Sequence, residues 1–180
     1  MPRSEQKYQL YFDFDRQAEI ATVQYALSPE RQGWQTEEQS VGRFTRVIKD
    51  GVIVRAPIDA ARHLLTNVYT PFETVDQEEM WALLMNRKQR ITHDVMIYRG
   101  TVDIIYIRTA ELFKEAVRVN APAIVLSHCH PSGEPYPSRE DVRTTELAIG
   151  AGKLLGIDLL DHIVVGDNAW ISMREEGLAF

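Results

Sequence analysis

The 180-residue chain has very little cysteine: Cys129 is its single thiol. One cysteine cannot form an internal disulfide, which excludes the small disulfide-stabilised scaffolds of secreted proteins. The chain also has no apolar run of membrane-spanning length, and its first residues lack the apolar core of a signal peptide. We therefore expect a protein of the reducing cytoplasm that does not associate with membranes.

Positive charge is also in short supply. Twenty Lys and Arg residues face 26 Asp and Glu residues, which gives a formal net charge of -6. Binding along a nucleic-acid backbone needs an excess of positive charge, so the composition argues against nucleic acid as a partner and leaves only a local basic patch open. The hydrophobic fraction of 44% and the charged fraction of 26% are typical of one folded domain rather than of a disordered chain.

The hydrophobic pattern changes near residue 50. Apolar and polar residues alternate over 8–14 and over 21–27, which predicts two short strands. The stretch 28–46 contains proline, glycine and a charged run, and its weak periodicity favours loop or irregular structure. We therefore expect residues 1–50 to be an N-terminal extension of short strands and loop, and residues 51–180 to be the main domain.

The main domain is predicted to alternate strands with helices. Pro57 is well placed to begin one helix, a second is expected over 110–119, and the longest should run from Ser138 to a C-terminal cap at Gly156. This order predicts an α/β (α+β) fold with a mixed β-sheet flanked by helices. The expected strands are 51–54, 80–85, 91–100, 102–107, 123–126, 162–165 and 169–173.

A candidate metal site lies at the end of the apolar strand 123–126. Side chains two apart on a strand share a face, so His128 and His130 can converge on one ion while Cys129 points away. Asp141 falls eleven residues after His130, in the first turn of the longest predicted helix. Two histidines and one carboxylate leave a fourth tetrahedral position for water, which is typical of catalytic rather than structural zinc.

Each of these residues also has a purely structural interpretation. A histidine at a strand end is often only a hydrogen-bonding residue, and Ser138 followed three residues later by Asp141 resembles a helix capping box. The joint pattern of His-x-His, seven residues, Ser, two residues and Asp is expected by chance on the order of once in a million start positions. The metal site is therefore the favoured interpretation.

A hydrolytic metal site also needs a carboxylate that is not a ligand, because a proton must pass from water to the leaving group. Glu78 and Glu79 stand at the head of the predicted strand 80–85 and are the candidates. The alternative for either residue is a solvated side chain before a strand.

The run SHCHPSGEPYPSRED at residues 127–141, followed by LLDHIVVG at 159–166, resembles the RadC family of JAB/MPN (JAMM motif) metalloproteins. The resemblance extends from about residue 76 to residue 177. It implies a cytidine-deaminase-like sandwich and a zinc ion on the three ligands named above. It also implies that Ser138 steadies the tetrahedral intermediate.

For the general acid/base the resemblance implies an upstream glutamate, which is Glu78, or Glu79 if the alignment slips by one residue. The implied function is that of a zinc-dependent metallohydrolase acting on peptide bonds or on isopeptide-linked proteins, ubiquitin-like ones included. A fold and a motif fix chemistry better than substrate, so two other classes stay open: a DNA repair-associated factor and a non-catalytic, metal-stabilised interaction module.

The chain departs from the family pattern at two places. Cys129 stands where the family usually has asparagine, and residues 1–50 do not resemble the helix-hairpin-helix module of fuller members. Within the resembling region, Asp161 and His162 are interpreted as structural or supporting hydrogen-bond partners. His63, His93 and the tryptophans Trp34, Trp81 and Trp170 are expected to be packed or solvated without chemistry.

Overall fold

The computed structural model describes residues 44–100 and 108–180. The strands expected at 8–14, 21–27 and 102–107, and Trp34, lie outside these ranges. The described elements are β1 (Thr45–Val47), α1 (Pro57–Asn67), the short 3₁₀ helix η2 (Phe72–Thr74), β2 (Glu78–Met85), β3 (Ile91–Gly100), α2 (Thr109–Arg118), β4 (Ala123–Cys129), α3 (Arg139–Leu155), β5 (Asp158–Val165) and β6 (Trp170–Ser172).

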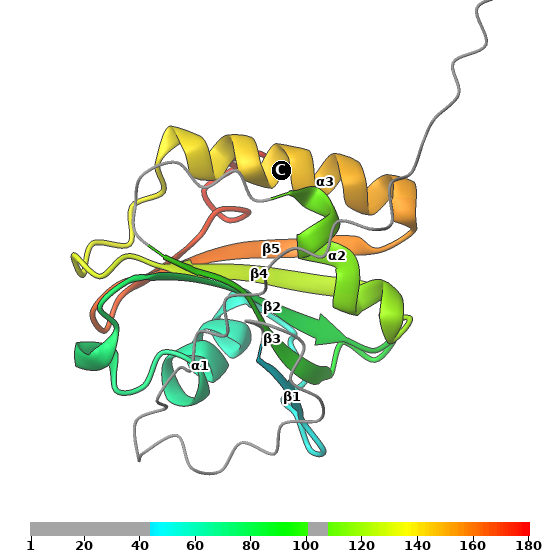
Figure 1. The fold of residues 1–180 in the computed structure, drawn as a ribbon, viewed down its shortest axis with the longest axis horizontal. Coiled ribbons are helices and arrows are strands. Elements are labelled where there is room, and N and C mark those ends of the chain that lie inside the picture. The colour runs from blue at the N-terminus through cyan, green and yellow to red at the C-terminus, as the bar shows by residue number, and fades with distance from the viewer. Residues whose placement is uncertain (1–43, 101–107) are drawn as a thin grey trace, which may run out of the picture.

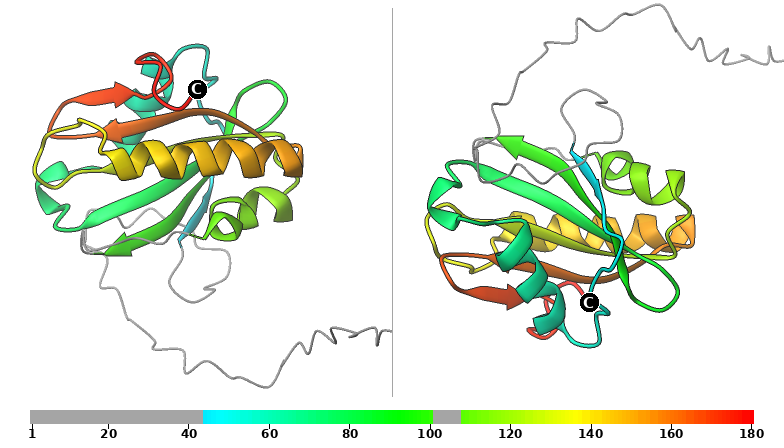
Figure 2. Two further views of the ribbon diagram at one scale, coloured as in Figure 1. Left: turned by 90° about the horizontal axis from the view of Figure 1, so that it is seen from above. Right: turned by 90° about the horizontal axis from the view of Figure 1, so that it is seen from below.

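The described strands form one six-stranded sheet in the order β1-β3-β2-β4-β5-β6. Strands β4 and β5 are parallel, and the other neighbouring pairs are antiparallel. Helix α1 covers one face of the sheet, while α2 and α3 cover the other (Figures 1 and 2). The structure thus confirms the predicted α/β (α+β) fold with a mixed sheet between helices.

Strand β2 shows how the sheet serves two hydrophobic cores. Its side chains alternate between the faces, so Met80, Ala82 and Leu84 pack in the core under α2 and α3. Trp81 and Leu83 pack in the core under α1. Because both faces are buried, the strand is apolar almost throughout. Even-numbered residues of β2 pack toward α2 and α3, and odd-numbered residues pack toward α1.

The helix ends follow the predicted signals. Pro57 is the first residue of α1, where its missing N–H costs nothing. Ser138 is the N-cap of α3, and Gly156 ends that helix in the left-handed conformation with φ 68°. No helix within residues 44–100 and 108–180 has both the length and the apolar character needed to cross a membrane.

Two expectations about residues before α1 were wrong. The segment 51–54 forms only an isolated bridge, between Ile53 and Arg90, instead of a strand. Its backbone packs closely against the β2–β3 turn: a Cβ on Gly51 would lie 1.9 Å from the carbonyl oxygen of Ile91. The second error concerns Thr45–Val47, in the stretch expected to be irregular, which pairs with β3 as the edge strand β1.

Candidate metal centre

The three predicted ligands are brought together by one strand and one helix. His128 lies near the end of β4, His130 follows that strand directly, and Asp141 is the third residue of α3. One potential ligand atom from each residue lies within 4.8 Å of the others. The chain therefore folds so that two imidazoles and one carboxylate face a common point.

The distances within this cluster are short. The Nε2 atoms of His128 and His130 are 3.1 Å apart. Asp141 Oδ1 lies 3.1 Å from His128 Nε2, and its Oδ2 lies 3.8 Å from His130 Nε2. His128 is buried, with 4% of its surface exposed, while the other two side chains are half-buried. The cluster is accessible from outside through His130 and Asp141.

The proton on His130 can be placed from its partner. Its Nδ1 lies 2.8 Å from the backbone oxygen of Glu134, and a carbonyl can only accept, so Nδ1 carries the proton. Nε2 of neutral His130 is then a lone pair facing the Asp141 carboxylate. Two acceptors that face one another are bridged by a proton or by a metal cation, and nitrogen and oxygen donors of this kind suit zinc.

The charge of Asp141 is set by competing effects. Burial opposes ionisation, but the neighbouring His128 ring and the hydrogen bonds from Ser138 outweigh it and hold the pKa of Asp141 below its ordinary value. For His162, whose ring contacts His128, burial and the neighbouring His128 lower the pKa to about 3, which favours the uncharged form. Asp141 is therefore a carboxylate anion, which can bind a metal through its oxygen atoms, and the His162 ring is neutral.

Ser138 begins α3 and shares a capping box with Asp141. The backbone N–H of Asp141 donates to Ser138 Oγ at 3.2 Å, and the N–H of Ser138 donates to Asp141 Oδ2 at 2.6 Å. The structural interpretation of this pair is thus correct, and it does not exclude the chemical one. The cap uses a lone pair of Oγ, and the hydroxyl itself lies beside the Asp141 carboxylate and lowers its pKa.

The register of the sheet separates the two candidate glutamates. Met80 pairs with His128, so by alternation Glu78 lies on the face of His128 and Glu79 on the opposite face. Glu79 is 1% exposed and accepts a hydrogen bond from Trp81 Nε1 at 2.9 Å. Glu78 is half-buried and begins β2 at the end of the sheet where His128 lies near the end of β4, although it is not one of the three converging residues.

Comparison with known proteins shows the family of the chain. The family model for the RadC-like JAB domain matches residues 55–178, which include the ligand cluster, Ser138 and both glutamates. The chain belongs to this family. A UPF0758 protein of Chloroflexus aurantiacus is 37% identical over 140 residues, which are 78% of this chain and 60% of that protein.

Two further UPF0758 proteins are also similar to this chain. One from Roseiflexus castenholzii is 42% identical over 127 residues, which are 71% of this chain and 53% of that protein. One from Bacillus cereus is 32% identical over 174 residues, covering 93% of this chain and 76% of that protein. The chain spans 60% or less of the first two of these relatives, so the match concerns the RadC-like JAB domain rather than their whole length.

Cys129 lies between His128 and His130, and its side chain faces away from both. Its side chain is buried in the core under α1, where the backbone N–H of Glu79 lies 3.4 Å from Sγ. Burial raises the pKa of this thiol to about 12, and the charges of Glu79 and Glu78 act in the same direction. The thiol is therefore protonated and lies on the wrong side of β4 to bind the ion.

Asp161 and His162 both act as hydrogen-bond partners, as interpreted from the sequence. His162 Nε2 lies 2.8 Å from His128 Nδ1, so it supports a ligand from behind. Asp161 accepts from Ser172 Oγ at 2.6 Å and thereby ties β5 to β6. Burial raises the pKa of Asp161 above its ordinary value.

The loop between His130 and α3 rests on the β5–β6 turn. The N–H of His130 donates to Val165 O at 2.9 Å, and the N–H of Asp167 donates to Gly133 O at 3.0 Å. The two backbones approach so closely that a Cβ on Gly166 would lie 2.1 Å from Gly133 O. Only glycine fits at residue 166, and backbone hydrogen bonds to the β5–β6 region fix the position of the loop.

A second histidine–carboxylate cluster, which the sequence did not predict, lies on the α1 face. His63 Nε2 is 2.8 Å from Asp94 Oδ1, and Arg46 Nε donates to Asp94 Oδ2 at 3.0 Å. Asp94 is fully buried. The three residues come from α1, β3 and β1, and no short-range motif links them, which is why sequence reasoning took His63 for an ordinary packed residue.

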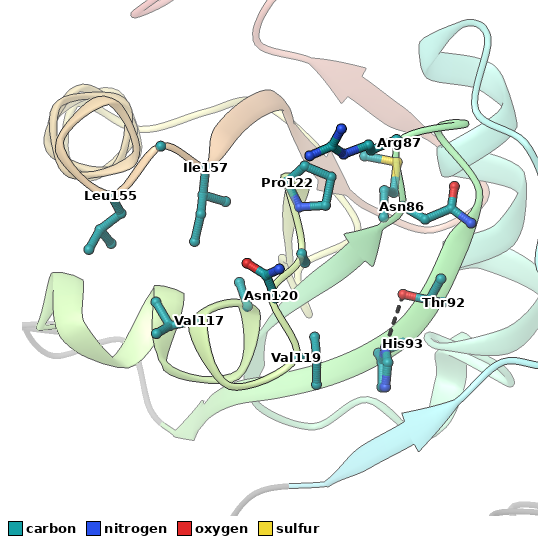
Figure 3. A pocket seen from close by; sticks show the side chains of 14 residues that line it. Asn86, Arg87, Thr92, His93, Val117, Val119, Asn120, Pro122, Leu155 and Ile157 are labelled. Atoms are coloured by element: carbon teal, nitrogen blue, oxygen red, sulfur yellow. Dashed lines mark hydrogen bonds between the residues drawn. The ribbon is translucent and has the colours of Figure 1, made fainter.

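A cavity of about 500 Å³ lies away from the metal centre, at the opposite end of β2 and β4. Figure 3 shows Arg87, His93, Asn120 and Leu155 around it. Its lining contains no carboxylate and no cluster of potential metal ligands. Cavity size therefore does not indicate where the chemistry of this RadC-like JAB domain resides.

Proposed function

We propose that this RadC-like JAB domain is a zinc-dependent metallohydrolase that cleaves peptide or isopeptide bonds. The observation that carries the proposal is the convergence of His128, His130 and Asp141 within 4.8 Å at the C-terminal end of β4, where His130 and Asp141 are only half-buried. Three protein ligands leave one tetrahedral position open, as in catalytic zinc sites. The donor set and the facing acceptors fit a divalent cation.

The residues of the chain divide the work of hydrolysis. A bound zinc ion supplies Lewis-acid chemistry, which polarises a carbonyl and acidifies water. Glu78, on the face of His128, accepts the proton of the attacking water and returns it to the leaving nitrogen. Ser138 Oγ–H, beside Asp141 at the start of α3, donates to the oxygen on which negative charge develops.

The accessibility of the site supports a macromolecular substrate. His130 and Asp141 are half-buried at the surface, whereas the cavity of about 500 Å³ lies elsewhere. An extended chain can lie across such an exposed site, so we propose a peptide or an isopeptide-linked protein, ubiquitin-like ones included, as substrate. The cytoplasm, where a lone thiol stays reduced, is the proposed compartment.

The metal is tested first. Elemental analysis of the purified full chain should find about one zinc ion per molecule. A protein that takes up no zinc from a metal-buffered solution would end the proposal.

Turnover is tested next, on a panel of peptide and isopeptide substrates. Glu78→Gln should keep its zinc and lose about 100-fold or more in kcat, because the proton shuttle is removed. Glu79→Gln is the matched control: it makes the same change on the opposite face, and kcat of its folded fraction should be close to that of the wild type. Zinc-loaded protein that cleaves nothing would instead favour a metal-stabilised interaction module.

A further inference from the structure

Thr145 lies one turn after Asp141 in α3, buried on the side that faces the sheet. Its Oγ1 is 2.6 Å from the backbone oxygen of Asp141 and 2.6 Å from His162 Nδ1. The sulfur of Met173 lies 3.5 Å away as a weak acceptor. One hydroxyl thus stands between the helix that supplies a metal ligand and the ring that supports another.

The protons in this chain of contacts can be assigned one after another. A carbonyl only accepts, so the single Thr145 proton goes to Asp141 O. The contact between Oγ1 and His162 Nδ1 then requires Nδ1–H of the ring to donate. In a neutral His162, Nε2 is consequently a lone pair, and it can only accept from His128 Nδ1–H at 2.8 Å.

The assignment ends at the metal centre. If His128 carries its proton on Nδ1, its Nε2 is a lone pair, and this atom lies 3.1 Å from His130 Nε2 and 3.1 Å from Asp141 Oδ1. The contacts form a closed circuit, because Asp141 both begins it through its carbonyl and ends it through its carboxylate. Two ligands on different elements are thereby linked through β5.

We propose that Thr145 is a positioning residue for the metal centre: acting through His162, it holds the His128 proton on Nδ1 and directs the Nε2 lone pair at the ion. This inference rests on the proposed zinc site and deepens it. It explains why a buried polar threonine lies in the apolar face of α3. A metal-binding histidine whose second nitrogen is held in this way is oriented before the ion arrives.

The proton positions are tested on the metal-free wild-type protein. Long-range ¹⁵N–¹H NMR correlations of the histidine rings distinguish the two tautomers. The expected result is Nδ1–H for both His128 and His162. A proton on His128 Nε2 in the neutral ring would overturn the proposal, and this measurement needs no variant and no activity.

Zinc affinity, measured by competition with a chromophoric chelator, tests the consequence. Thr145→Val keeps the shape and removes the hydroxyl, so zinc affinity should fall by about 10- to 100-fold. Thr145→Ser keeps the hydroxyl and should restore the affinity to within about threefold of the wild type. Thr144→Val makes the same change one residue away and should leave affinity unchanged.

The outcomes separate this inference from the proposed function. Zinc affinity that depends on the Thr145 hydroxyl, in a protein that cleaves no substrate, supports the inference and contradicts the hydrolase. Unchanged affinity in a folded Thr145→Val protein overturns the inference, even if the enzyme is active. If Thr145→Val does not fold, the comparison of Thr145→Ser with wild type and the tautomer measurement still decide.

Discussion

Two clusters of histidine and carboxylate occupy opposite faces of the same sheet, and they differ in how their hydrogen-bonding groups are matched. On the α1 face, the two oxygens of Asp94 receive donors from His63 and Arg46. On the α3 face, the Asp141 carboxylate faces the lone pair of His130 Nε2. The first cluster is complete within the protein, whereas the second has an excess of acceptors.

The comparison shows that residue types alone do not identify a metal site. A buried carboxylate with a donor on each oxygen joins elements of the fold, and here it links α1, β1 and β3. A cluster in which acceptors converge can take up a proton or a metal cation from solution. The direction of the protons therefore distinguishes the structural cluster from the one proposed to bind zinc.

The largest expected effect is on metal content. The double variant His128→Ala/His130→Ala removes two of three ligands and should contain no stoichiometric zinc by elemental analysis. His63→Ala, on the α1 face, should keep about one zinc ion per chain in its folded fraction. Zinc lost equally from both variants would contradict the division between the two clusters.

The reactivity of Cys129 sharpens the contrast between the faces. A pKa of about 12 instead of 9.0 makes the thiolate fraction near pH 8 about a thousandfold smaller than for an unperturbed thiol. Labelling with a thiol-specific reagent should therefore be slow in the folded protein and fast in urea. Saturation with zinc should not change the rate, and protection that appears only with zinc would place the thiol at the metal centre.

The third prediction concerns the stability of the α1 face. Asp94→Asn should lower the free energy of unfolding by about 3 kcal/mol, because Arg46 and His63 would lose a buried anionic partner. Urea unfolding of metal-free protein measures the change. The folded variant should still bind zinc, since none of its metal ligands is altered.

The smallest expected effect comes from the same substitution in the other cluster. Asp141→Asn should destabilise the metal-free protein less than Asp94→Asn does, because asparagine can still accept from the N–H of Ser138. Zinc affinity should nevertheless fall sharply. If Asp141→Asn destabilises the metal-free protein as much as Asp94→Asn does, the two clusters serve the same structural purpose.

The convergence of His128, His130 and Asp141 was predictable because its signals are local and periodic. Alternation on β4 placed His128 and His130 on one face, and the cap signals of α3 placed Asp141 in its first turn. The choice between Glu78 and Glu79 could not be made from sequence, since it depends on the register of β2 against β4.

The errors came from segments whose structure is decided by partners far away in sequence. Thr45–Val47 becomes a strand because the edge of β3 is free to accept it, and 51–54 fails to become one because it crosses the β2–β3 turn. The link from Thr145 to His162 was missed for the same reason. Its only sequence signal is a hydroxyl four residues after a ligand, on an otherwise apolar helix face.

The close contact between Gly133 and Gly166 has a consequence for the order in which the protein matures. A chain emerging from the ribosome presents all three proposed metal ligands before β5 has been synthesised. It then lacks both the ring of His162 behind His128 and the backbone beneath the ligand loop. A metal ion that bound at that stage would bind to a loop that β5 does not yet hold in place. We therefore expect selective zinc binding only after β5 has joined the sheet.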